Sequence, residues 1–273
     1  MQSLRNLAFA GAAALALAPA AARGADLPVP PPMFRAPIVE DYGAWYLRGD
    51  IGITNQHVKK LDSPAPGFDT TTVLVQGFDS AGLFGAGIGY KFNNWFRFDV
   101  TGEYRAGARF SELDNFPCPS CPTGFGVDRY EATKSEWLFL ANAYLDLGTW
   151  HSVTPFVGAG IGFDRLTIGN FTDTNIVNTA IGFSTNNSKW NFAWALHAGL
   201  AYQVTPNFTV ELAYRYVNLG NGSTKDMIGY DFSNATFNPI LFKHVDSQDI
   251  KLGVRWMFAD TFFPEPPPLV RKY

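Results

Sequence analysis

Hydrophobic and polar residues alternate with a period of two in several segments of this chain. The clearest case is the segment 95–106, which reads WFRFDVTGEYRA. There Phe96, Phe98 and Val100 occupy one set of alternate positions, and charged side chains occupy most of the other set. Successive side chains of a β-strand point to opposite faces of its sheet. The segment is therefore predicted to be a strand with one apolar face and one charged face.

Similar segments recur along the chain and predict eight strands. These are residues 44–53, 81–92, 95–106, 135–147, 154–165, 190–203, 207–218 and 248–258. The short connections cover 93–94, 148–153 and 204–206, and the long connections cover 54–80, 107–134, 166–189 and 219–247. Short periplasmic turns that alternate with long extracellular loops are typical of bacterial outer-membrane barrels. The predicted fold is an all-β, eight-stranded antiparallel up-and-down transmembrane barrel over residues 42–258.

The first 24 residues have the composition of a secretory leader. Arg5 supplies a positive charge, residues 7–18 are apolar, and the small residues Ala22 and Gly24 suit cleavage after Gly24. The apolar run is shorter than the roughly 20 residues that a membrane-spanning helix needs. We therefore expect a signal peptide over residues 1–24, and we expect any membrane crossing to use strands.

Proline-rich segments flank the predicted barrel at residues 25–41 and 259–273. Proline cannot donate a hydrogen bond to a neighbouring strand, so neither segment is expected to form a central strand. An even number of strands leaves both ends of a barrel on the same side of the membrane. Both segments are therefore predicted to be periplasmic, a lead-in and a tail to a barrel in the outer membrane of a Gram-negative cell.

Composition favours a membrane barrel over a soluble one. Charged residues make up 16% of the chain and aromatic residues 15%, whereas charged residues are about 25% of a typical soluble domain. Tryptophans fall near predicted strand ends, as in the aromatic girdles of membrane barrels; these are Trp45, Trp95, Trp137, Trp190 and Trp256. A soluble eight-stranded barrel with an apolar interior is the alternative. The net charge of -3, without a basic stripe, argues against a nucleic-acid partner.

The charged faces of the predicted strands form a set of inward-facing residues. An eight-stranded barrel is only wide enough for side chains to fill its interior. Because each unpaired buried charge would cost several kcal/mol, we expect these residues to pair in a buried network. The predicted inward-facing residues are Arg48, Asp50, Lys91, Arg97, Asp99, Glu103, Arg105, Glu136, Asp146, Asp164, His197, Glu211, Arg215, Asp249, Lys251 and Arg255. A neighbouring carboxylate is the expected partner of His197.

No catalytic, cofactor or metal site is predicted. The two GAGIG segments, at 85–89 and 158–162, have glycines spaced by two, unlike a dinucleotide-binding loop, and are expected to make room for long side chains in the barrel interior. Cys118 and Cys121 have no nearby zinc ligands and are expected to form a local disulfide. His57 and His244 fall in the first and last long connections, which become neighbours when the barrel closes, so a metal or haem contact stays open there.

The last predicted strand carries the residues on which a family resemblance rests. The segment 251–258 reads KLGVRWMF, and Gly253, Trp256 and Phe258 match the pattern of the barrel-assembly signal of outer-membrane proteins. Together with the leader and the paired glycine-rich strands, this segment resembles the small opacity-protein and OmpA-like barrels, and in particular the surface porin-family antigens of alphaproteobacteria. In most such proteins the final aromatic residue ends the chain, whereas this chain continues to Tyr273.

The resemblance implies a structural and surface-exposed role without enzymatic activity or a cofactor. The expected roles are envelope integrity, adhesion or ligand contact through the long loops. The expected partners are outer-membrane lipid and lipopolysaccharide, the barrel-assembly machinery, and host or environmental ligands. A narrow porin-like diffusion channel and a surface receptor for a small ligand such as haem are the alternatives. A lipid-modifying barrel enzyme is a further possibility, for which no catalytic constellation is visible.

Overall fold

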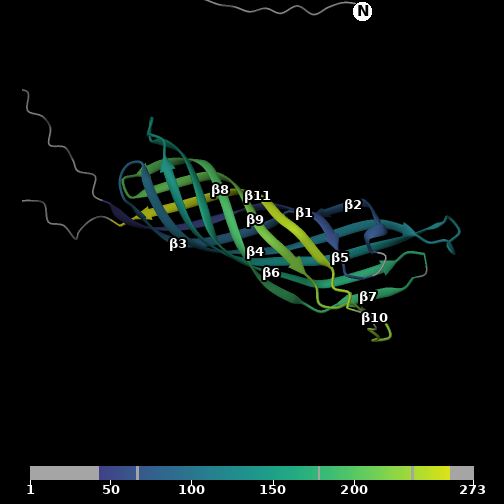
Figure 1. Cartoon of the computed structure of the whole chain (residues 1–273). Coiled ribbons are helices and arrows are strands. Elements are labelled where there is room, and N and C mark those ends of the chain that lie inside the picture. The colour runs from purple at the N-terminus through teal and green to yellow at the C-terminus, as the bar shows by residue number, and fades with distance from the viewer. Residues whose placement is uncertain (1–42, 66–67, 178, 235–236, 259–273) are drawn as a thin grey trace, which may run out of the picture. The chain divides into compact units, whose positions relative to one another are not determined.

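Eight long strands pair in an antiparallel ring in the computed structural model, which describes residues 43–65, 68–177, 179–234 and 237–258 (Figure 1). The ring strands are β1 (Ala44–Asp62), β3 (Ala81–Lys91), β4 (Phe96–Pro117), β5 (Phe125–Asp146), β6 (Val153–Asn175), β8 (Asn187–Thr205), β9 (Phe208–Ser223) and β11 (Leu241–Met257). Each pairs with its neighbours along the chain, and β1 closes the ring by pairing with β11. The prediction of an eight-stranded antiparallel barrel is confirmed.

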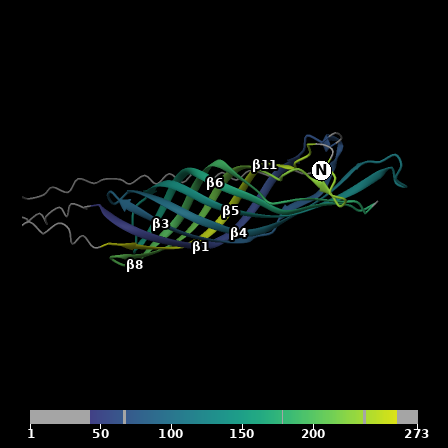
Figure 2. The same ribbon diagram turned by 90° about the horizontal axis from the view of Figure 1, so that it is seen from below.

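Short connections lie at one end of the ring and long connections at the other (Figure 2). We call these the short-turn end and the long-connection end. The short-turn end has residues 92–95, 147–152 and 206–207, and the described residues of the long-connection end are 63–65, 68–80, 118–124, 176–177, 179–186, 224–234 and 237–240. The long-connection end also carries the helical turn η1 (Phe68–Thr70) and three short strands, β2 (Thr72–Phe78), β7 (Ile181–Ser184) and β10 (Ile228–Gly229). Strand β2 pairs with β4, and β7 lies between β6 and β10.

The strands extend much further toward the long-connection end than the sequence pattern predicted. Strand β4 continues to Pro117 and β5 begins at Phe125, so most of the predicted loop 107–134 is paired strand. The alternation persists in this part of the chain, but a register shift between Arg105 and Ala108 changes the inward-facing positions of β4 from odd-numbered to even-numbered residues. Ala108 and Phe110 are buried inside the ring, whereas Arg109 between them is exposed outside. Long loops were therefore the wrong prediction over much of these segments.

The outer surface of the ring nearer the short-turn end is apolar. Phe98, Val100 and Leu212 point outward and are 38%, 49% and 55% exposed. All seven tryptophans are also at least 36% exposed, and Trp137 and Trp190 flank Arg165 on neighbouring strands. A soluble barrel would bury these side chains, so the soluble alternative is wrong. Beyond this level several strands carry exposed polar side chains, among them Asn55, His57, Arg109 and Glu131, as expected where a barrel leaves lipid for water.

The interior of the ring has two layers that differ in polarity. Charged side chains fill the layer enclosed by the apolar outer surface. Toward the long-connection end an apolar core replaces them, centred on Phe242, whose ring lies 5.0 Å from that of Phe110 and 6.3 Å from that of Phe171. No helix among the described residues is long and apolar enough to cross a bilayer.

Inward-facing glycines leave room for large side chains from neighbouring strands. A Cβ atom at Gly89 would lie 2.3 Å from the ring of Tyr46, and one at Gly158 would lie 2.5 Å from the ring of Tyr144. Both tyrosines are buried in the interior. The GAGIG segments thus provide space for packing inside the ring.

Candidate functional site

Arg48 of β1 connects carboxylates from three different strands of the ring. Its guanidinium lies 2.7 Å from Asp99, 2.8 Å from Asp50 and 3.4 Å from Glu211. It also donates a hydrogen bond of 3.1 Å to the Tyr144 hydroxyl. Because strand alternation brings all these side chains to one face, the sequence pattern alone is enough to place them inside the ring.

A second group of ion pairs lies around Arg215 of β9. Arg215 contacts Asp249 at 2.7 Å and also binds Glu103. Lys251 lies 3.1 Å from Glu103 and 3.5 Å from Asp50, which connects this group to Arg48. Each of these three carboxylates therefore has at least one cationic partner, as burial requires.

Arg97 and Arg255 lie on the side of the network nearer the short-turn end. Arg97 pairs with Asp146 at 3.1 Å and Glu211 at 3.4 Å. Its guanidinium lies over the Tyr144 ring, 4.1 Å from the ring centre, a favourable cation–π geometry. Arg255 pairs with Glu211 at 3.4 Å. Arg97 and Arg255 therefore lie between the rest of the network and the opening at the short-turn end.

Arg105 and Lys134 complete the network on the other side. Arg105 lies 2.6 Å from Asp249 and 3.4 Å from Glu136. Lys134 pairs with Glu136 at 2.7 Å and donates to Gln56 at 2.6 Å. Lys134 was not among the predicted inward-facing residues, because it falls in the predicted loop 107–134. The alternation that continues from Glu136 back through Lys134 is the signal that could have found it.

Most of the predicted inward-facing residues are buried inside the ring. Arg255 is slightly exposed, and Lys91 lines a cavity of about 610 Å³ at the opening of the short-turn end. The prediction that a carboxylate contacts His197 is wrong. Nε2 of His197 lies 3.2 Å from Oδ1 of Asn142. A buried imidazole can be satisfied by an amide as well as by a carboxylate.

The two predicted disulfide cysteines lie on a connection, and the two predicted histidines of the long connections lie on strands β1 and β11. Cys118 and Cys121 form a disulfide in the connection between β4 and β5. His57 and His244 are exposed, and Nδ1 of His57 lies 3.3 Å from Asp246. No group of three His, Cys, Asp or Glu residues within the described ranges could hold a metal ion.

The three residues of the assembly-signal pattern lie near the end of β11. Gly253 faces inward, where a Cβ atom would lie 2.6 Å from Oδ1 of Asp50. Trp256 and Phe258 point outward and are 54% and 45% exposed. The Phe258 amide donates to the Trp45 carbonyl at 3.0 Å, which brings this aromatic pair to the closing edge of the ring.

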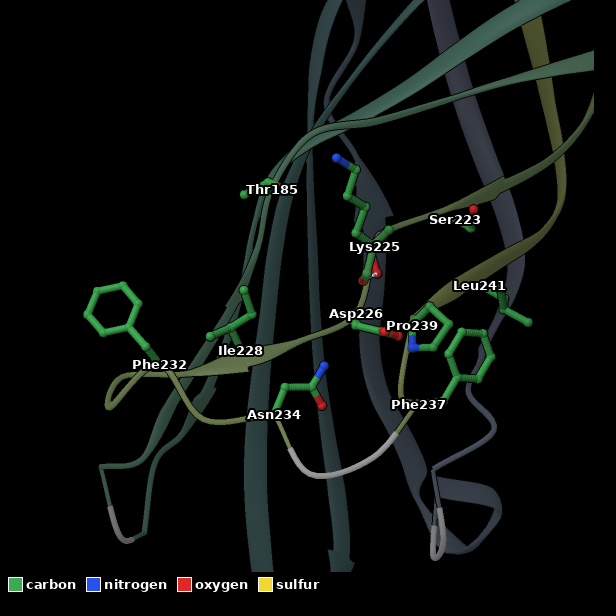
Figure 3. A pocket seen from close by; sticks show the side chains of 11 residues that line it. Thr185, Ser223, Lys225, Asp226, Ile228, Phe232, Asn234, Phe237, Pro239 and Leu241 are labelled. Carbon is green, nitrogen blue, oxygen red and sulfur yellow. Dashed lines mark hydrogen bonds between the residues drawn. The ribbon is translucent and has the colours of Figure 1, made fainter.

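A surface pocket of about 620 Å³, which we call the rim pocket, lies at the long-connection end beside β10 (Figure 3). Phe237, Pro239 and Leu241 lie together on one side of it, and Phe232 lies on the other. The connection is held by Asp226 and Asn238: the Asn238 amide donates to Asp226 at 3.3 Å, and the Met227 amide donates to Asn238 at 2.9 Å.

Phe232 and Phe237 line the rim pocket, and Tyr230 lies on the same connection. Tyr230 is 75% exposed, Phe232 81% and Phe237 71%. Large apolar side chains grouped on a water-exposed surface mark sites of interaction with ligands or other macromolecules. None of these residues could be predicted from the sequence, because a long connection carries no periodic pattern that would mark them.

The match to a protein-family model agrees with this architecture. Residues 7–258 match the family described as outer membrane protein beta-barrel domain. An uncharacterized protein of Brucella suis is 32% identical over 235 residues, which cover 77% of this chain and 79% of that protein. A candidate adhesin of Rickettsia canadensis is 30% identical over 186 residues, covering 67% of this chain and 76% of that protein. The crystal structure of Neisserial surface protein A aligns with 79% of this chain and 99% of its own, at 19% identity and a TM-score of 0.43.

Proposed function

The chain belongs to the outer membrane protein beta-barrel domain family, and from this premise we propose that it is a sealed surface barrel that contacts ligands or host surfaces through its long-connection end. In this proposal the long-connection end lies outside the cell, and both ends of the chain lie in the periplasm. The polar exterior beyond Trp137 and Trp190 supports this orientation, because that part of the ring is suited to water.

The observation that carries the proposal is the filled interior. Ion pairs occupy the ring from Arg97 to Lys134, and the apolar core around Phe110 and Phe242 follows directly. Interdigitated side chains at both levels oppose a continuous aqueous path, which favours a structural or adhesive role over transport. The proposal assigns no enzymatic activity and no cofactor to the chain.

The rim pocket supplies the contact surface in this proposal. Tyr230, Phe232 and Phe237 offer large aromatic area at the tip of the protein, and aromatic residues are enriched at sites that dominate binding energy. The similarity to a candidate adhesin supports the same assignment. Lys225 and Asp226 add polar groups that could orient a ligand in the pocket.

An adhesion assay tests the proposal directly. The protein is displayed in a non-adherent bacterial strain, and attachment to cultured epithelial cells is counted. We expect attachment with the native chain, and its loss when Tyr230, Phe232 and Phe237 are replaced by serine together. Phe125→Ser, which removes a 52% exposed aromatic from the start of β5 at the same end, is the matched control. Equal attachment of the triple variant and the native chain would refute the assignment of the contact surface.

A conductance measurement separates the proposed role from the channel alternative. Refolded protein in a planar bilayer is expected to show little steady current, because paired charges and an apolar core occupy the interior. Steady single-channel conductance would instead favour a narrow diffusion channel. A small-ligand receptor is a second candidate, which the 620 Å³ volume of the rim pocket favours.

We also propose that Gly253, Trp256 and Phe258 serve as the signal read by the barrel-assembly machinery. Their place at the closing edge of the ring supports this role, since Phe258 joins β11 to the start of β1.

A further inference from the structure

A second cavity at the long-connection end is lined by both carboxylates and aromatic rings. Its volume is about 410 Å³, within the range of about 300–1,000 Å³ that is usual for small-molecule sites. Asp128 and Tyr130 of β5, Asp173 of β6 and Phe68 of η1 line it. We call it the acidic cavity.

Strand register gathers four carboxylates at this level of the ring. Asp114 of β4 lies directly opposite Asp128, and Tyr130 lies between Glu112 of β4 and Asp173 of β6. Like charges directly opposite each other on neighbouring strands destabilise a sheet. The arrangement contrasts with the lumen network, the group of ion pairs around Arg48 and Arg215 nearer the short-turn end. There Asp50, Asp99 and Glu103, for example, each contact Arg or Lys.

Internal partners compensate this negative charge only weakly. Within the described residues, the closest polar contact of Glu112 is the Gln76 amide at 2.7 Å, and no Lys or Arg forms an ion pair with any of the four carboxylates. Asp114 is fully buried, and its partners are neutral groups, the Thr71 side chain and nearby backbone amides. A buried carboxylate without a cationic partner is costly unless a cation or a proton neutralises it.

The electrostatic environment agrees with this picture. Burial raises the pKa of Asp173 to about 7, with further increases from Asp128 and Asp114, and it raises the pKa of Asp128 to about 6. Burial likewise raises the pKa of Glu112 to about 7. The titratable side chains that face one another here are Glu112 and Asp114 from β4, Asp128 and Tyr130 from β5, and Asp173 from β6. A positive ligand would favour their ionised forms and so release protons on binding.

The aromatic wall identifies the class of cation. The rings of Phe68 and Tyr130 lie 6.4 Å apart, and Tyr130 stacks on Phe171 with 5.9 Å between centroids. Aromatic faces attract ammonium and guanidinium groups, whereas Ca²⁺ and Mg²⁺ prefer a shell made only of oxygen ligands. Carboxylates beside aromatic faces, in a cavity of this size, fit an organic cation.

We propose that the acidic cavity binds an organic ammonium cation, held by Asp128 and Asp173 and packed against Phe68 and Tyr130. The cation supplies the positive charge that the surrounding strands lack. The site goes beyond the contact role of the rim pocket, and its test in detergent does not depend on attachment to cells.

The test is a calorimetric titration of the full refolded chain in detergent micelles with 1,5-diaminopentane. We expect saturable binding, weakened about tenfold or more by Asp173→Asn and by Asp128→Asn, because each removes one charge-assisted contact. Both substitutions keep the side-chain shape and reduce repulsion, so folding should survive, and heat-modifiable migration on a gel checks this. Glu131→Gln is the matched control, since Glu131 lies on the same strand but is exposed outside the ring.

Three outcomes would overturn the proposal. The first is no saturable binding of the diamine by the native chain. The second is an equal loss of affinity with Glu131→Gln, which would indicate general attraction to a negative surface. The third is tighter binding of calcium chloride at matched ionic strength together with no effect of Phe68→Leu, which would make the cavity a metal site. A loss of diamine affinity with Phe68→Leu, without a change in calcium binding, would support the aromatic contribution.

Discussion

Arg215→Ala is expected to destabilise the barrel strongly, because it removes a buried cation from the centre of the lumen network. Arg215 is 1% exposed and contacts both Asp249 and Glu103. After its removal, Asp249 keeps Arg105 at 2.6 Å, and Glu103 keeps Lys251 at 3.1 Å. Each carboxylate therefore loses one of its two cationic partners.

The expected loss of unfolding free energy follows from the cost of leaving a buried charge with too few partners of opposite charge. Removing one member of a buried ion pair costs about 3–5 kcal/mol, whereas loss of a solvated pair costs about 0–1 kcal/mol. Because Arg105 and Lys251 remain, we expect a loss near the lower end of the first range, about 3 kcal/mol. Combining Arg215→Ala with Glu103→Gln should recover part of the loss, since it neutralises one of the two affected carboxylates.

The assay is urea unfolding in lipid vesicles, followed by tryptophan fluorescence, with the unfolding free energy taken from the midpoint and slope. Arg109→Ala is the control: Arg109 is exposed on the outer surface of β4, and such changes usually stay within about 0.5 kcal/mol. An unchanged midpoint for Arg215→Ala, together with steady conductance of the native chain, would refute the sealed interior and show that water solvates these charges.

Three further predictions test the orientation, assembly and electrostatics of the barrel. Val100→Arg, on the apolar outer surface, should lower the unfolding free energy in vesicles by about 2–4 kcal/mol, and an unchanged urea midpoint would show that Val100 does not face lipid. A chain truncated after Phe258 should still give a heat-modifiable, membrane-inserted band, whereas Trp256→Ala should reduce insertion; loss of insertion on truncation alone would place an essential signal beyond Phe258. Burial raises the pKa of Asp128 from about 3.8 to about 6 and the pKa of Asp173 from about 3.8 to about 7. Protonation of these two carboxylates therefore stabilises the folded state. This contribution is fully present below about pH 4 and is lost as the pH rises toward 7. The double variant Asp128→Asn, Asp173→Asn should therefore gain stability relative to the native chain between pH 4 and 7, measured as the difference between their urea midpoints, and a constant difference across that range would contradict the assignment.

The sequence by itself determined the strands and the faces of the barrel wall. Period-two alternation places Arg97, Asp99 and Glu103 on one face because side-chain direction in a strand is a local property of the backbone. The same argument predicts outward Phe98 and Val100. Paired glycines likewise predicted an interior crowded by large side chains, although the sequence did not reveal which side chains occupy that space.

Only the tertiary structure decided which charges meet and where the strands end. Arg48 contacts Asp99 and Glu211, which lie 51 and 163 residues away along the chain, because register and ring closure set these contacts and neither is a local property. A register shift beyond Arg105 changes the inward-facing positions of β4. The predicted strands stop at this level, so Lys134, which lies opposite Ala108, was assigned to a loop and missed.

The acidic cavity depends on tertiary structure in the same way. Asp114 and Asp128 look like ordinary loop residues until strand pairing sets them opposite each other. The alternation of residue types along a strand indicates which environment each of its faces meets. Which side chains contact one another across the barrel depends on how all the strands pair.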